Sequence, residues 1–153
     1  RETGIMDVLD YGCGKGALAK YLSFPIKEYD PAIPGKDNLP EPAEMVICRD
    51  VLEHVEQEYI DEVLQDLQRV VKRFGYFVIN HSPSCKVLPD GRNAHILQRP
   101  QGWWLEKLQL CFVLLQFQTW IGNGEFITGP RAGEKFPFTE SWAYVRRKIS
   151  SNA

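Results

Sequence analysis

The residues with the clearest chemical meaning stand near the start of the chain, where Asp10 precedes Gly12, Gly14 and Gly16. An apolar, β-prone run comes before them and helix formers come after, which indicates a strand, a tight turn and a helix. Glycine permits such a turn and lets a ligand approach the backbone where a Cβ would collide. Because Asp10 is an acid, the turn suits a ligand with a cationic amino group better than a pyrophosphate.

The glycine spacing separates this turn from two common nucleotide-binding loops. It reads G-x-G-x-G, not the G-x-G-x-x-G of dinucleotide-binding folds. No G-x-x-x-x-G-K-[ST] surrounds Lys15, so a P-loop is excluded. A glycine-rich turn without any ligand is the alternative that the loop alone leaves open.

A second acidic residue stands where a ribose-binding carboxylate is expected. Asp30 comes 18 residues after Gly12, close to the distance of about 20 typical of such folds. A carboxylate there can accept hydrogen bonds from both ribose hydroxyls, each worth about 1.5–3 kcal/mol. The alternative is an acid that opens an Asp-Pro turn with Pro31.

Polar residues also follow the apolar run at 45–48, where Arg49 and Asp50 come next. A buried parallel strand would deliver both to its carboxyl end, the edge at which open α/β sheets bind ligands.

Together these motifs resemble the class I S-adenosylmethionine-dependent methyltransferases, particularly a small-molecule branch of that family. The matching stretches are V-L-D-Y-G-C-G-K-G at 8–16, Y-D-P at 29–31 and D-V-L-E-H-V at 50–55. The resemblance covers roughly residues 5–80 and implies S-adenosyl-L-methionine as cofactor and methyl transfer to a small-molecule acceptor. Two alternatives stay open: a non-catalytic S-adenosylmethionine-binding module that works with a protein partner, and an NAD- or nucleotide-binding Rossmann domain.

The resemblance also implies which residues bind the cofactor. Asp10 would lie near the methionine amino group, Asp30 with Pro31 at the ribose, and Arg49 with Asp50 beside the methionine and sulfonium. Asp37, with Asn38, is the only nearby candidate for the adenine amino group. The backbone along the methionine part would come from Tyr11, Gly12, Cys13, Gly14 and Gly16.

The three histidines are candidates for a base that removes a proton from the acceptor, since imidazole titrates near neutral pH. His95, in a long polar loop, is the first choice for substrate contact, followed by His54 and His81. No tight His/Asp/Glu spacing accompanies them, so no metal site is expected from the sequence.

Strand-like and helix-like runs alternate along the chain, which predicts an α/β, Rossmann-like, mostly parallel sheet. A short helix is expected from the glycine loop to about residue 22, and longer ones at 57–73 and 103–110. Only fourteen proline-rich residues separate Asp30 from Met45, so the third strand of the family and its helix should be missing or vestigial. Strands at 112–120 and 141–149 should form an antiparallel pair, and the remaining strands are expected at 5–9, 26–30, 45–48 and 76–79.

The composition fits a globular protein: 44% of residues are hydrophobic and 25% are charged. We expect one domain over 1–153 that lacks the family's usual N-terminal helix. Basic residues are dispersed and the net charge is −2, which disfavours nucleic-acid binding. Four widely spaced cysteines predict free thiols and a cytoplasmic location, and no apolar run reaches the ~18 residues of a membrane span.

Overall fold

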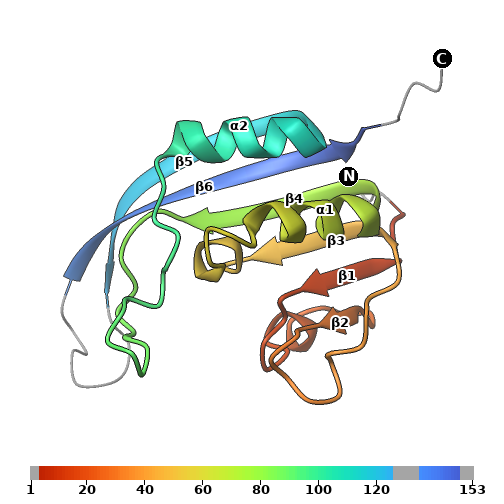
Figure 1. Cartoon of the computed structure of the whole chain (residues 1–153). Coiled ribbons are helices and arrows are strands. Elements are labelled where there is room, and N and C mark those ends of the chain that lie inside the picture. Colours follow the sequence, from red (N-terminus) through yellow and green to blue (C-terminus); the bar gives the residue numbers. More distant parts are fainter. Residues whose placement is uncertain (1–3, 126–134, 149–153) are drawn as a thin grey trace.

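The computed structural model describes residues 4–125 and 135–148 as a single twisted sheet with two α-helices (Figure 1). Two 3-10 turns complete the secondary structure of the described residues. In chain order the elements are β1 (Val8–Tyr11), η1 (Leu18–Lys20), β2 (Lys27–Tyr29), β3 (Ala43–Arg49), η2 (Leu52–His54), α1 (Ile60–Val70), β4 (Val71–Asn80), α2 (Gln101–Cys111), β5 (Phe112–Glu125) and β6 (Lys135–Arg147).

The sheet has the strand order β2-β1-β3-β4-β6-β5. The first four strands are parallel, and β6 pairs antiparallel with both β4 and β5. This arrangement confirms the predicted Rossmann-like sheet with an antiparallel C-terminal pair. Residues 31–42 contain turns but neither a helix nor a strand, so β2 is an edge and the predicted loss of the third strand is confirmed.

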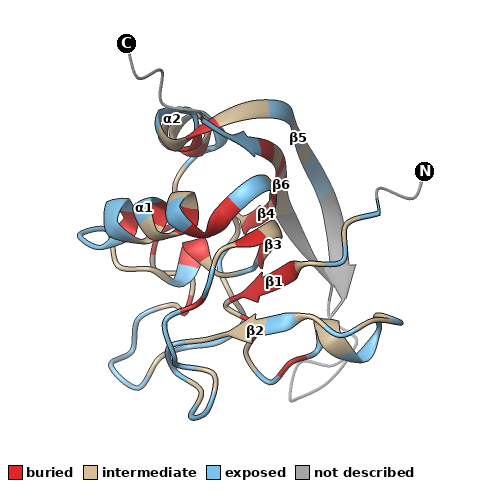
Figure 2. Ribbon diagram, turned by 90° about the vertical axis from the view of Figure 1, so that its right-hand side faces the viewer, coloured by how far each residue is buried: buried red, intermediate tan, exposed pale blue. Residues whose placement is uncertain are grey.

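Both α-helices cover the same face of the sheet (Figures 1 and 2). Helix α1 turns a buried stripe toward β3 and β4, with apolar side chains recurring at helical spacing. Strand residues such as Leu9, Val46 and Phe77 meet it from the sheet, and each is at most 1% exposed. The buried helical residues are Ile60, Leu64, Leu67 and Val70 of α1 and Trp104 and Leu108 of α2.

Three elements differ from the sequence-based expectation. The helix expected after the glycine loop is only the three-residue turn η1, in a segment bounded by Gly16 and Pro25 and too short for more than about two helical turns. The helix expected over 57–73 ends at Val70, and Val71 already begins β4. Along β5 a register irregularity falls between Leu114 and Gln116.

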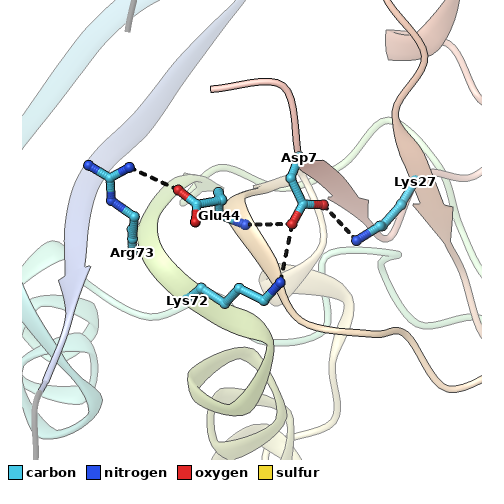
Figure 3. A network of polar contacts seen from close by, with 5 residues as sticks. All are labelled: Asp7, Lys27, Glu44, Lys72 and Arg73. Carbon is cyan, nitrogen blue, oxygen red and sulfur yellow. Dashed lines mark hydrogen bonds and ion pairs between the residues drawn. The ribbon is translucent and has the colours of Figure 1, made fainter. Parts of the chain in front are cut away.

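The amino ends of the parallel strands are tied together by ion pairs (Figure 3). Asp7, just before β1, binds Lys27 Nζ at 2.6 Å and Lys72 Nζ at 3.3 Å. The hydrogen bond from Lys27 is the main reason why the pKa of Asp7 is lowered. Arg73 pairs with Glu44 at 2.9 Å beside them. This network therefore supports the edge of the sheet opposite the strands' carboxyl ends.

No helix within residues 4–125 and 135–148 combines the length and apolar character needed to cross a membrane. All four cysteines belong to the described residues and are free thiols, so no disulfide cross-links them.

Candidate active site

A cleft of about 500 Å³ opens at the carboxyl ends of β1 and β3. Its wall comes from four parts of the chain: the end of β1 with the glycine loop, the η1 turn, the end of β3 and the middle of β4. The lining residues are Asp10, Gly12, Cys13, Ala17, Leu18, Tyr21, Ile47, Arg49, Asp50 and Tyr76.

Strand register explains why these side chains share one face of the sheet. Asp10 pairs with Glu28 on one side and with Ile47 on the other, and Ile47 pairs with Tyr76. Directly paired residues point to the same face, and their neighbours Leu9 and Val46 point to the helix-covered face. The cleft therefore lies on the sheet face opposite α1 and α2.

Asp10 is a buried acid in the wall of the cleft. It is 5% exposed, and no described residue donates a hydrogen bond to its carboxylate. Burial, reinforced by the Glu28 carboxylate, raises the pKa of Asp10 to about 6. Lys36 and Arg49 offset this effect only in part, so a cationic group that reached the carboxylate would be attracted to it.

The glycine loop fits closely against its neighbours. Gly12 has φ 80°, and a Cβ there would collide with the Val51 side chain. Gly16 has φ 75°, and a Cβ there would meet Glu28 and Lys36, which form an ion pair of 3.0 Å. Residue 12 therefore requires glycine for both its backbone conformation and its space, whereas at residue 16 the backbone conformation favours glycine and the side-chain ends could shift.

Asp30 joins the end of β2 to this loop. Its Oδ2 accepts a hydrogen bond from the Gly14 amide at 2.8 Å, and its Oδ1 accepts one from Ala32 at 2.9 Å. The second bond is the Asp-Pro turn that the sequence left open as an alternative. Each carboxylate oxygen keeps a further lone pair for another donor.

Arg49 and Asp50 stand at the mouth of the cleft and pair with each other at 3.2 Å. Asp50 has φ 53°, and it is the only non-glycine residue with a positive φ in the described part of the chain. Such strained backbone is concentrated at functional sites. The strained backbone conformation therefore lies at Asp50, one of the residues that the sequence predicts to bind the cofactor.

The structure separates the remaining predicted cofactor residues from the cleft lining. The Tyr11 hydroxyl donates to Asp66 at 2.9 Å, so this side chain points toward α1 and only its backbone belongs to the loop. Pro31 and Asp37 are exposed and do not line the cleft. Asp37 instead accepts a hydrogen bond from the Gly35 amide at 3.0 Å.

None of the three histidines lines the cleft. His81 is bound at both ring nitrogens, by the Arg99 carbonyl at 3.0 Å and by Ser141 Oγ at 2.7 Å. His54 and His95 lie against each other, with ring centroids 4.9 Å apart. One potential ligand atom from each of these two rings and one from the buried Glu53 lie within 4.8 Å of one another.

Sequence reasoning missed several residues of the lining, of which Tyr21 and Tyr76 are the largest. Tyr21 is 88% exposed beside the cleft, and its place one turn after the glycine loop was the available signal. Tyr76 lies in a strand that the sequence correctly predicts. That its side chain lies on the cleft side of the sheet follows only from its pairing with Ile47. Tyr76 also lines a shallow hollow with Gln116, Gln118, Trp142 and Tyr144.

Several solved structures of methyltransferases share the fold of this chain. The 1,6-didemethyltoxoflavin-N1-methyltransferase of Burkholderia thailandensis is similar in structure, with 17% identity, a TM-score of 0.60 and coverage of 93% of this chain and 71% of that one. Magnesium protoporphyrin IX methyltransferase of Synechocystis gives 16% identity, a TM-score of 0.58 and coverage of 94% and 74%. The N-methyltransferase NodS of Bradyrhizobium japonicum gives 13% identity, a TM-score of 0.58 and coverage of 95% and 87%.

At these identities the solved structures establish the fold. No curated protein matches the chain in sequence. Residues 5–114, well over half of the chain, match the family described as a methyltransferase domain. The chain therefore belongs to the methyltransferase-domain family.

Proposed function

We propose that this chain transfers a methyl group from S-adenosyl-L-methionine to a small-molecule acceptor, with the cofactor held in the cleft. The observation that carries the proposal is the buried, unpaired carboxylate of Asp10 beside the glycine loop of a methyltransferase-family chain. The Burkholderia and Synechocystis methyltransferases were both solved with S-adenosylhomocysteine bound, and the former also with its small-molecule substrate. These relatives favour the methyltransferase over the NAD- or nucleotide-binding alternative.

The cleft residues, and Asp30 outside the cleft lining, take distinct roles in this proposal. Asp10 accepts the cationic amino group of the methionine part, which compensates its buried charge. The backbone of Gly12 and Cys13 lies along the methionine chain, and the loop keeps this path because a Cβ at residue 12 would collide with the Val51 side chain. Asp30 uses the free lone pairs of its oxygens for the ribose hydroxyls, and Arg49 with Asp50 stands at the mouth of the cleft.

The cofactor supplies an electrophilic methyl group on a sulfonium, and the chain supplies position. Holding an acceptor atom in line with that methyl contributes about 7–11 kcal/mol to barrier lowering without any acid–base step. Tyr76 lines both the cleft and the hollow beside it. We place the acceptor over this aromatic surface of β4, β5 and β6, which suits a flat, largely apolar molecule.

The missing third strand leaves the adenine side of the site open. Residues 31–42 form turns, and Asp37 engages its own loop through Gly35. The adenine ring is therefore held weakly, and the methionine and ribose parts supply most of the affinity.

Isothermal titration calorimetry with S-adenosylhomocysteine tests the proposal. Wild-type protein should bind, Asp10→Asn should bind more weakly, and Asp7→Asn should match the wild type. Asp7 is the appropriate control because it is an acid on the same chain segment that faces the opposite edge of the sheet. Absence of binding to the wild-type protein would contradict the proposal.

Turnover is tested separately, by measuring S-adenosylhomocysteine formation with a panel of small aromatic acceptors. Binding without turnover on any acceptor would instead favour the non-catalytic cofactor-binding module.

A further inference from the structure

A second group of chemically competent side chains lies outside the cleft, where η2 meets the long loop before α2. Glu53 and His54 belong to η2, and His95 belongs to the loop. One ligand atom from each lies within 4.8 Å of the other two. The loop approaches η2 closely, because the Leu97 amide donates to the Glu53 carbonyl at 2.9 Å.

The Glu53 carboxylate is buried and only half satisfied. The residue is 0% exposed. Its Oε1 accepts a hydrogen bond from the Asn80 amide at 3.0 Å, whereas its Oε2 has no partner among the described residues. A buried carboxylate oxygen without a partner is costly, and a cation beside it would remove that cost.

Both histidines make the hydrogen bond that commonly supports a metal-binding imidazole. His54 Nδ1 donates to the Ala94 carbonyl at 2.7 Å, and His95 Nδ1 donates to the Ser82 carbonyl. A carbonyl only accepts, so the proton sits on Nδ1 and the lone pair of each ring is left on Nε2. A backbone carbonyl on the second nitrogen is the usual outer partner of a metal-ligating histidine.

The loop that carries His95 is itself fixed in place. Asn93 Oδ1 accepts hydrogen bonds from the amides of Ser84 and His95, both at 2.9 Å, and Asn93 Nδ2 donates to the Ser84 carbonyl at 2.8 Å. Arg92 pairs with Glu56 at 2.7 Å, which ties the same loop to the residues after η2. The backbone at His95 is therefore fixed beside η2 without an ion.

We propose that Glu53, His54 and His95 bind one divalent transition-metal ion, and that Zn²⁺ fits this set of two imidazoles and one carboxylate. One potential ligand atom from each side chain lies within 4.8 Å of the other two, so the three side chains need to draw closer around a tetrahedral ion. His54 is exposed, which gives the ion a route from solvent. Three protein ligands leave a fourth position for water or another oxygen donor, the pattern of catalytic rather than structural zinc sites.

Metal titration of the intact chain tests this site. Dialysed wild-type protein should take up about one Zn²⁺ per chain, measured by elemental analysis, and Co²⁺ should give the visible absorption of a low-coordinate nitrogen–oxygen site. Zn²⁺ at about 100 times its Kd should raise the Tm by about 5–10 °C. Glu53→Gln and His95→Gln should each weaken Zn²⁺ binding at least about 100-fold.

Matched controls separate a metal site from a merely buried acid. His81→Gln changes a histidine whose two nitrogens are already occupied, and Glu62→Gln changes an exposed acid on α1. Both should bind Zn²⁺ like the wild type. Without metal, Glu53→Gln should keep the wild-type Tm, because the amide has the shape of the acid and its oxygen still accepts from the Asn80 amide.

Failure of the wild type to bind Zn²⁺, or full retention of binding by Glu53→Gln and His95→Gln, would overturn the site. The result is independent of the proposed methyl transfer. Zn²⁺ uptake without S-adenosylhomocysteine binding would contradict only the proposed function, and the reverse would contradict only the metal site.

Discussion

Cofactor binding should depend on pH through one carboxyl group, that of Asp10. Burial raises its pKa to about 6, so the group is protonated in an appreciable fraction of molecules below neutral pH. The cationic amino group of S-adenosylhomocysteine is attracted by the carboxylate and not by the neutral acid. Binding should therefore weaken as the pH falls through 6.

The size of the effect follows from the ionised fraction. About one tenth of Asp10 is ionised at pH 5 and nearly all of it at pH 8. The Kd for S-adenosylhomocysteine should therefore be about tenfold higher at pH 5 than at pH 8, a loss of about 1.4 kcal/mol in binding free energy. Asp10→Asn should abolish this dependence and weaken binding at pH 8 by about 10- to 150-fold, the value of a charge-assisted hydrogen bond.

Ionisation of Asp10 should strengthen cofactor binding but lower the free energy of unfolding. Between the unfolded pKa of 3.8 and the folded value of about 6, the folded state binds more protons than the unfolded state. The unfolding free energy therefore falls as the pH rises through this window, by up to about 3 kcal/mol. Asp10→Asn should lose that fall and be more stable than the wild type at pH 8.

Calorimetry across pH 5–8 and urea unfolding across pH 3–8 measure the two effects. If Asp10→Asn binds S-adenosylhomocysteine more weakly than the wild type but has a higher free energy of unfolding, then Asp10 serves ligand binding at the expense of stability. A Kd that is flat from pH 5 to 8 in the wild type, or an Asp10→Asn variant with reduced stability at pH 8, would refute the reasoning.

Three further substitutions probe other parts of the molecule. Gly12→Ala should lose S-adenosylhomocysteine binding in calorimetry, because φ 80° is strained for alanine and its Cβ would collide with Val51; unchanged Kd would contradict the tight loop. Asp7→Ala should lower the unfolding free energy by about 1 kcal/mol or less, since its two lysine pairs are partly solvated. That loss should fade below pH 4, because the pKa of Asp7 is lowered, and urea unfolding at pH 3 and 7 checks it. Tyr21→Ala should weaken S-adenosylhomocysteine binding by severalfold and leave the Tm unchanged, since the side chain is 88% exposed; a lower Tm would show that the ring packs into the fold.

Patterns that are local in the sequence predicted most of the architecture. The glycine loop, the helical stripe of α1 and the apolar run of β3 each follow from neighbouring residues, and the proline-rich segment at 31–42 correctly predicted the absent strand. The strand at 112–120 shows the limit. Strict alternation from Val113 predicts that Leu115 and Phe117 share its apolar face, but the irregularity between Leu114 and Gln116 shifts the alternation. Leu115 is therefore 47% exposed, while Leu114 and Phe117 pack on the core.

Part of the candidate site could also be predicted from the sequence. Asp10, Gly12 and Arg49 lie at the ends of strands, and strand ends can be located from the sequence pattern. The contact between His54 and His95 depends on how a long loop folds back over η2, and no spacing rule covers that. The adenine role of Asp37 stays a prediction, and the structure adds only that its Oδ1 accepts a hydrogen bond from the Gly35 amide.

The two outer strands of the sheet expose their unpaired backbone to very different degrees. Strand β2 offers only three residues, and Lys27 places a charge on it. A foreign strand would find too few amides there to add on, so the shortened side of the sheet is protected against edge-to-edge aggregation. Strand β5 is a 14-residue edge, interrupted by the register irregularity between Leu114 and Gln116. Because β5 offers many more unpaired backbone groups than β2, self-association in concentrated solution should begin at β5. A lysine introduced at the exposed Leu115 is the simplest way to suppress it.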